Sequence, residues 1–167
     1  DKYDQAYFVR TDKYDNVFIY GQTKATGTTL IQNADYNKPN SGQFITKFDN
    51  ALDSIVWSTT FGTGNGKPNI SPTAFAVDIC NRIYISGSGR EWTEWRGFVY
   101  DPDLGYQVYD FGWDYIDGTK NMDITPDAYQ DTTDGQDFYV MVMDNDASDL
   151  LYATFFGEIF YGGCTLI

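Results

Sequence analysis

The sequence contains no histidine among its 167 residues. Within this chain, that absence excludes Ser-His-Asp and Cys-His catalysis and zinc or iron sites built on histidine. Cysteine is nearly absent as well, since Cys80 and Cys164 are too few for a disulfide framework or a four-thiolate zinc site. Cys80 ends the apolar stretch AFAVDIC, which predicts a buried, unreactive thiol. No apolar run approaches the roughly 18 residues that a membrane-spanning helix requires.

Basic residues are scarce: 11 Lys and Arg stand against 24 Asp and Glu, for a net charge of −13. A field of that sign repels nucleic acids and anionic lipids, so we expect neither nucleic acid partners nor membrane insertion. The balance suits an extracellular or cell-surface protein. The chain opens on Asp1 without a methionine or a signal peptide, which we interpret as a mature product or an excised piece of an exported protein.

Aromatic residues are plentiful, at 18% of the chain, and they favour strands over helices. The apolar residues come in short runs rich in Val, Ile, Tyr, Phe and Thr, each bounded by Gly, Asn, Asp or Pro. Such runs are typical of strands, and no stretch keeps a helical period for three turns. The sequence therefore predicts an all-β fold. The clearest runs are VFIYG (17–21), QFITKFD (43–49), SIVWSTTFG (54–62), TAFAVDI (73–79), RIYISG (82–87), DFYVMVMD (137–144) and LLYATFFG (150–157).

The runs form an internal repeat. DNVFIYG (15–21) aligns with NRIYISG (81–87) at an offset of 66, and the stretch 43–62 aligns with the stretch 138–157 at an offset of 95. Two units follow, over roughly 8–62 and 74–157. The second is longer by the difference between the offsets (95 − 66 = 29), all of it inserted between its second and third strands. We divide the chain into 1–72, the first unit with its link, and 73–167, the second unit with the insertion at about 90–121.

Four short strands per repeat are the pattern of a β-propeller blade, although a β-sandwich or a barrel remains an alternative. A propeller closes with about four to eight blades, so two blades need further neighbours. We therefore expect about two four-stranded blades of a larger propeller. The glycine-rich stretch GTGNG (62–66) is interpreted as the start of a flexible link that runs on to Pro72.

The units resemble the seven-bladed β-propeller repeats of large cell-surface proteins in gliding and related Bacteroidota. The matching stretches are VDICNRIYISG (77–87), ITPDAYQDTTDGQDFYVMVMD (124–144) and LLYATFFG (150–157). Where the family usually has Cys-Gly-Asn, this chain has Cys80-Asn81-Arg82. The resemblance implies export, commonly by type IX secretion, and a place in a long adhesin or gliding-motility structure. It implies no enzyme activity.

The phrase DNDASD (144–149) carries three carboxylates at short spacing. Asp144, Asp146 and Asp149 could begin a calcium loop, because calcium prefers about six to eight hard oxygen ligands. The alternative is a tight turn, since Asp, Asn and Ser bond their own backbone. In the first copy Ala51 and Ser54 replace Asp146 and Asp149, so the turn chemistry repeats and the ligand set does not. Calcium is the only cofactor that we consider.

The insertion concentrates aromatic residues between carboxylates. Exposed aromatics of this kind fit a protein partner or the apolar face of a sugar. They could equally fill the contact of a small hairpin packed over the propeller edge. The candidate contact residues are Trp92, Trp95, Tyr100, Tyr106, Trp113 and Tyr115.

Two tripeptides, at Ser54 and Thr132, resemble the Asp-Ser/Thr acceptor of O-glycosylation in Bacteroidota. Taken together, we predict a non-enzymatic structural or adhesive module that contacts other blades or domains of its parent protein and a protein or polysaccharide surface. A carbohydrate-binding module is the alternative. A glycosidase fragment ranks last, because two carboxylates about 5–9 Å apart occur by chance among so many acids.

Overall fold

The computed structural model describes residues 4–89, 94–112 and 118–157, with 94–97 and 109–112 described by their backbone alone. These residues form ten β-strands and no helix, which confirms the all-β prediction. The described part of the chain accordingly has no candidate for a membrane-spanning helix. The strands are β1 (Asp4–Thr11), β2 (Val17–Thr23), β3 (Gln43–Phe48), β4 (Ile55–Phe61), β5 (Ile70–Val77), β6 (Ile83–Gly89), β7 (Glu94–Asp101), β8 (Tyr106–Gly112), β9 (Phe138–Met143) and β10 (Leu150–Phe156).

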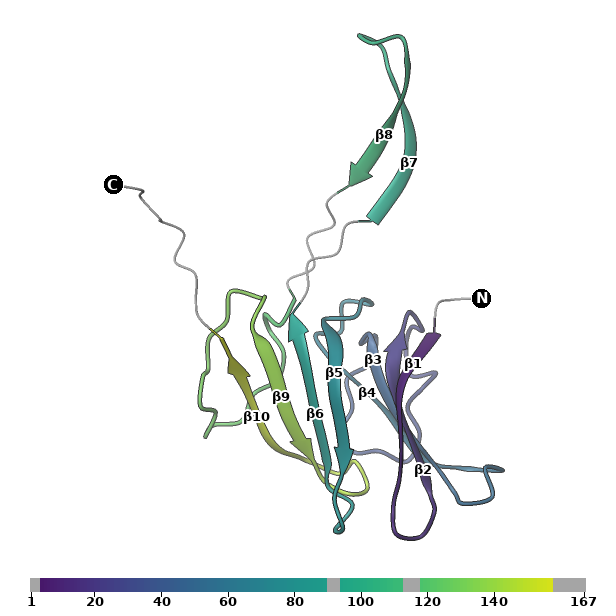
Figure 1. The fold of residues 1–167 in the computed structure, drawn as a ribbon, viewed down its shortest axis with the longest axis vertical. Coiled ribbons are helices and arrows are strands. Elements are labelled where there is room, and N and C mark those ends of the chain that lie inside the picture. Colours follow the sequence, from purple (N-terminus) through teal and green to yellow (C-terminus); the bar gives the residue numbers. More distant parts are fainter. Residues whose placement is uncertain (1–3, 90–93, 113–117, 158–167) are drawn as a thin grey trace.

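Eight strands make two antiparallel sheets of the same topology (Figure 1). Sheet 1 has the order β1-β2-β3-β4, and sheet 2 has the order β5-β6-β9-β10, so each strand pairs with its neighbour in the repeat. The hairpin β7–β8 lies between the second and third strands of sheet 2 along the chain, where the sequence placed the insertion. In the described residues the two sheets do not close into a ring or a barrel.

The repeat holds residue by residue. β1 and β2 become β5 and β6 on adding 66, and β3 and β4 become β9 and β10 on adding 95, with every strand end coinciding. Even the register shifts match, between Ala6 and Phe8 and between Pro72 and Ala74. The first strand of each unit begins earlier than the sequence indicated, so the end of the expected link, Ile70–Pro72, belongs to β5.

A glycine shared by the two repeats has a steric reason. A Cβ atom at Gly21 would lie 2.2 Å from the carbonyl oxygen of Gln5, and one at Gly87 would lie 2.8 Å from that of Ser71. The second strand of each unit therefore needs glycine where it pairs with the bulged part of the first strand.

The two sheets pack through opposite faces. We name face A the side that carries Phe18, Tyr20 and Trp57 on sheet 1, together with its equivalent on sheet 2, and face B the other side. Face A of sheet 1 packs on face B of sheet 2, and the rings of Tyr20 and Phe75 lie 5.5 Å apart across the boundary. The face B residues of sheet 2 in this core are Phe75, Ile83, Ile85, Tyr139, Met141, Met143, Ala153 and Phe155.

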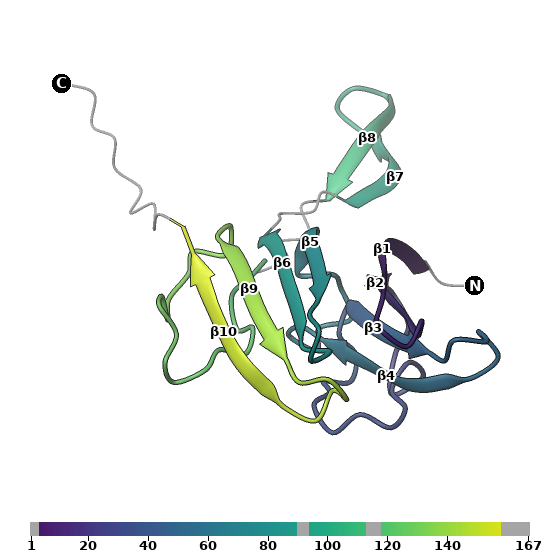
Figure 2. The same ribbon diagram turned by 60° about the horizontal axis from the view of Figure 1, so that its bottom comes forward.

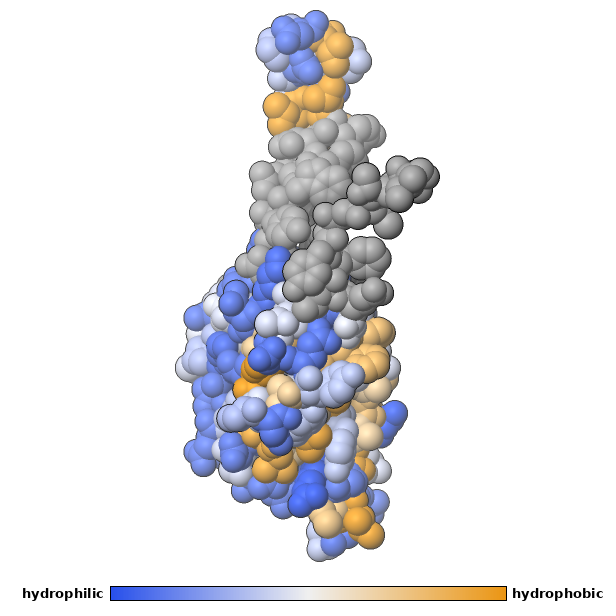
Figure 3. All heavy atoms as spheres, turned by 90° about the vertical axis from the view of Figure 1, so that its left-hand side faces the viewer, coloured by the Kyte–Doolittle hydropathy of each residue, from blue (hydrophilic) through white to orange (hydrophobic). Residues whose placement is uncertain are grey.

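One face of each sheet remains outside this core. Face B of sheet 1 carries an apolar groove, lined by Ile19, Phe44 and Phe48 among others. Face A of sheet 2 exposes Tyr84 by 38% and Phe156 by 59%. Viewed from the side of β10, hydrophobic residues interrupt a largely hydrophilic surface (Figure 3). The hairpin β7–β8 lies apart from both sheets in Figures 1 and 2.

Candidate contact surfaces

The first turn of each unit is built around one aspartate. In sheet 1 the Asp12 carboxylate accepts hydrogen bonds from the backbone N–H groups of Tyr14 (2.9 Å) and Asn16 (3.0 Å) and forms an ion pair with Lys47 at 3.2 Å. Asn81, from the equivalent turn of sheet 2, donates its Nδ2–H to Asp12 at 3.3 Å. Burial raises the pKa of Asp12, but the side chain of Asn16, the two backbone N–H groups and Lys47 outweigh it and lower the pKa overall.

Asp78 is the same residue in sheet 2. It accepts hydrogen bonds from the backbone N–H groups of Cys80 (2.8 Å) and Arg82 (2.9 Å) and from the Tyr84 hydroxyl (3.1 Å). Burial raises its pKa, and these donors lower it below the ordinary value. Val142 occupies the position of Lys47, and Asp78 is half-buried. The turn is thus repeated, while its cation is not.

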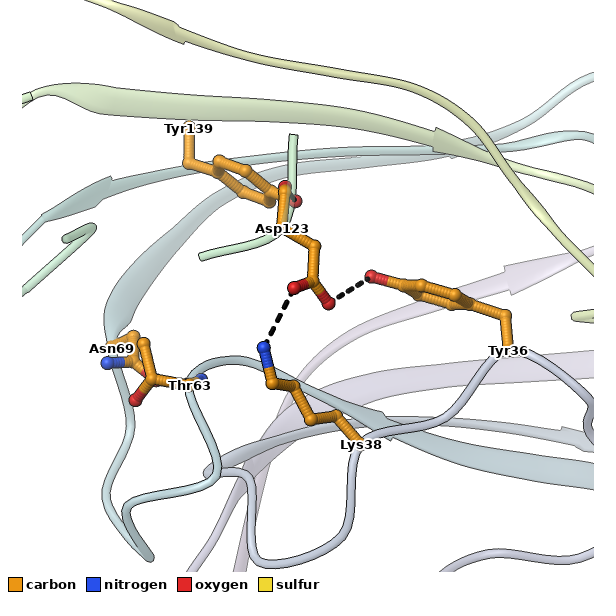
Figure 4. Close-up of polar contacts among 6 residues, drawn as sticks. All are labelled: Tyr36, Lys38, Thr63, Asn69, Asp123 and Tyr139. Atoms are coloured by element: carbon orange, nitrogen blue, oxygen red, sulfur yellow. Dashed lines mark hydrogen bonds and ion pairs between the residues drawn. The ribbon is translucent and has the colours of Figure 1, made fainter. Parts of the chain in front are cut away.

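A polar cluster joins the segments that follow β2 and precede β9 (Figure 4). Lys38 pairs with Asp123 at 2.8 Å, and the Tyr36 hydroxyl donates to the same carboxylate at 3.4 Å. The Tyr139 hydroxyl donates to the backbone carbonyl of Asp123 at 2.6 Å. Burial raises the pKa of both tyrosines well above the ordinary value, so they act as neutral donors. Sequence reasoning missed this cluster, because three of its members lie in loops where the repeat is weakest.

The link between the units is fixed by Asn69, which is fully buried. Its Oδ1 accepts the backbone N–H of Thr63 at 3.0 Å, and the two side chains lie next to each other in Figure 4. Its Nδ2 donates to the carbonyl of Gly118 at 3.0 Å. From sheet 1, Gln22 donates to the carbonyl of Ile70 at 2.7 Å. The expected flexible link is therefore anchored on both sides.

The hairpin exposes its described aromatic residues. Tyr100 is 61% exposed and Tyr106 is 58% exposed, so these two do not fill a contact with the sheets. Asp101 holds the hairpin turn by accepting the backbone N–H groups of Asp103 and Leu104 at 2.9 and 3.2 Å. Of the other candidates, Trp95 lies in β7 without a described side chain, and Trp92, Trp113 and Tyr115 lie outside the described residues.

The acidic phrase forms the turn between β9 and β10. Asp144 accepts the backbone N–H of Asn145 at 2.8 Å, and Asp146 accepts that of Ser148 at 3.1 Å. Hydrogen bonding from Ser148 lowers the pKa of Asp146 despite some burial. Within the described residues, no group of three or more Asp, Glu, Cys or His side chains is arranged to hold a metal. Calcium at Asp144, Asp146 and Asp149 stays a prediction.

Three other sequence candidates lie at the surface. Ser54 and Thr132 are exposed, and the Ser54 hydroxyl donates to Asp49 at 2.6 Å, so O-glycosylation there stays a prediction. The prediction of a buried thiol at Cys80 is wrong, because Cys80 is exposed. It follows β5 within the turn around Asp78, where the apolar stretch has already ended.

Comparison with protein-family models, curated proteins and solved structures gives no match for this chain. Functional inference therefore depends on the residues themselves. The geometry offers two open sheet faces, a polar turn that contacts the next unit, and a projecting aromatic hairpin.

Proposed function

We propose that the chain is a non-enzymatic structural or adhesive module of an exported bacterial cell-surface protein, made of two four-stranded blades of a larger β-propeller. Its open sheet faces contact further units of the same kind, and its hairpin contacts an outside partner.

The packing of opposite faces carries the proposal. A head-to-tail interface leaves one unsatisfied copy of each face at the two ends, and repetition of such an interface gives a ring or a filament. β5 lies beside β1, so the first strands of the two units are neighbours. First strands gathered at a common centre are the arrangement of propeller blades. The aromatic and aliphatic side chains on both open faces are what a stacked unit would cover.

The hairpin supports the adhesive part of the proposal. Exposed tyrosines on a projecting two-stranded arm provide large, amphipathic contact area. A carbohydrate-binding module is the second candidate, because the exposed Tyr106 is paired with Asp101 across the hairpin and Tyr100 precedes this carboxylate.

A three-unit chain tests the stacking. Residues 63–157 are repeated once after Gly157, so that a second copy of sheet 2 presents its face B to the open face A. We expect one cooperative thermal transition at a higher temperature than that of the two-unit chain. Val140→Asp in the middle unit, on face A, is the control that should abolish the increase. A third unit that melts separately would overturn the proposal.

Variants of the hairpin test the contact. We expect Tyr100→Ala and Tyr106→Ala to reduce binding to whole Bacteroidota cells or to a polysaccharide array, while Tyr14→Ala, which removes an equally exposed tyrosine from the turn between β1 and β2, leaves binding unchanged. Binding to polysaccharide but not to protein-coated surfaces would favour the second candidate. Binding that is unaffected by both substitutions would remove the hairpin from the proposal.

A further inference from the structure

We propose that Asp15 prevents sheet 1 of one copy from docking on sheet 2 of another copy, and that the unit which follows sheet 2 carries an amide or a basic side chain at this turn position. The inference rests on the proposed stacking function and adds to it the identity of the partner that the open face accepts.

The occupied interface shows what this turn position does. Asn81 adopts φ 65° at its turn and donates to Asp12 of the preceding unit at 3.3 Å. The other side-chain atom of Asn81, Oδ1, is buried without a hydrogen-bond partner. A side chain at this turn position can therefore donate one hydrogen bond to the preceding unit. Its second polar atom is buried and has no hydrogen-bond partner. A neutral amide tolerates this arrangement.

Sheet 1 carries a carboxylate at the corresponding position. Asp15 adopts φ 63° and aligns with Asn81 in the repeat, so the two residues hold the same place in their turns. If sheet 1 docked on sheet 2 of another copy, Asp15 would take the place of Asn81 and face Asp78. Asp78 holds the place of Asp12, with Val142 in the position of Lys47.

The carboxylates of Asp15 and Asp78 would then face each other in a partly desolvated interface. Like charges at hydrogen-bond distance repel, and a charged oxygen in the place of the unpaired Oδ1 atom would have no donor. Arg82 offsets part of this repulsion, because its charge already helps to lower the pKa of Asp78. The open face thus favours a following unit with a donor, as sheet 2 itself has, and disfavours a unit like sheet 1.

The apolar surfaces by themselves do not discriminate. The groove of sheet 1, lined by Ile19, Phe44 and Phe48, and the exposed Tyr84 and Phe156 of sheet 2 offer the same kind of contact that the internal interface buries. Hydrophobic contact is non-directional. Selection between partners consequently falls to the charged turn, and removal of one carboxylate is enough to test it.

The test is sedimentation velocity of the full chain over a range of concentrations. We expect Asp15→Asn to self-associate head to tail with a dissociation constant roughly ten-fold lower than that of the wild type, and Asp15→Lys to associate more strongly still. Asp127→Asn, the same charge change at an exposed site on a distant loop, should behave as the wild type. Adding Val140→Asp on face A to Asp15→Asn should restore the wild-type behaviour.

One result would overturn the inference: an Asp15→Asn chain that associates no more strongly than the wild type, although the three-unit chain shows docking of its third unit. Failure of the three-unit chain would instead count against the stacking function. Circular dichroism of each variant confirms that the sheets are intact.

Discussion

Asp12 and Asp78 are the same residue in two copies of one unit, yet their surroundings differ. Asp12 is buried, paired with Lys47 and contacted by Asn81 of the next unit, whereas Asp78 is half-buried and has Val142 in the place of that lysine. The turn hydrogen bonds are shared, and the burial is not. The comparison teaches that each unit dictates its own turns, while the neighbouring unit decides which face becomes core.

The largest difference should appear between Phe18 and Tyr84, which are equivalent positions of the two units and both belong to face A. Phe18 is fully buried against sheet 2, so Phe18→Ala should lower the free energy of unfolding by about 3–5 kcal/mol. Tyr84→Ala removes a partly exposed ring and should cost about 1 kcal/mol. Urea denaturation measures both, and equal losses would contradict the assignment of the open face.

The buried ion pair should give the next largest effect. Lys47→Met leaves the Asp12 carboxylate buried without its cation, and we expect a loss of roughly 3 kcal/mol. The matched change in the other unit, Val142→Lys, adds a cation beside a carboxylate that water already reaches, so it should change stability little. Thermal denaturation compares the two variants. A large gain in stability from Val142→Lys would contradict the prediction, because a half-buried Asp78 should gain little from a nearby cation.

The two aspartates should also respond to pH in the same direction. Folding lowers the pKa of Asp12 and of Asp78, so the charged carboxylates stabilise the folded state above the ordinary value of 3.8. That contribution is lost as the pH falls through the folded values. The difference in unfolding free energy between the wild type and Asp12→Asn should therefore narrow as the pH is lowered through and below 3.8. A difference that widens on acidification would contradict this sign.

The polar cluster between the loops should contribute less. The side chains of Lys38 and Asp123 are 32% and 40% exposed, so Asp123→Asn should cost below about 1 kcal/mol. Tyr139→Phe removes a buried hydroxyl donor and should cost about 1 kcal/mol. A double-mutant cycle for Lys38 and Asp123 isolates the ion pair. A coupling energy clearly larger than that of an exposed pair would contradict this prediction and show that the Lys38–Asp123 ion pair contributes substantially to holding the two units together.

The smallest effect is expected from chelation. Because the carboxylates of Asp144 and Asp146 accept backbone N–H groups within their own turn, removal of calcium should leave the melting temperature unchanged. Scanning calorimetry with and without EDTA measures this. If EDTA lowers the melting temperature and added calcium reverses the decrease, this turn binds a structural calcium ion.

Much of the fold could be predicted, because the repeat is evident from the short apolar runs and the turn residues that bound them. The offsets of 66 and 95 located the eight sheet strands and the insertion. The predictions failed where local pattern and position disagree. Cys80 follows an apolar run but lies past the strand end, and Ile70–Pro72 resemble a link because Pro72 is not a usual strand residue. Pro72 is tolerated because β5 is an edge strand of sheet 2 with a register shift after this residue.

The sequence by itself determined the strands, the two copies of the unit and the turns, since these depend on residues close together along the chain. Only the tertiary structure decided that face A of sheet 1 covers face B of sheet 2, because the inner strands β2 and β9 carry apolar side chains on both faces and alternation alone does not choose between them. The same contact brought Asn81 to Asp12, two residues that are distant along the chain. The sequence alone does not predict this contact, because it depends on the β5–β6 turn packing beside the β1–β2 turn. The same packing shows that Asp15 has a carboxylate at the position where Asn81 has its donor.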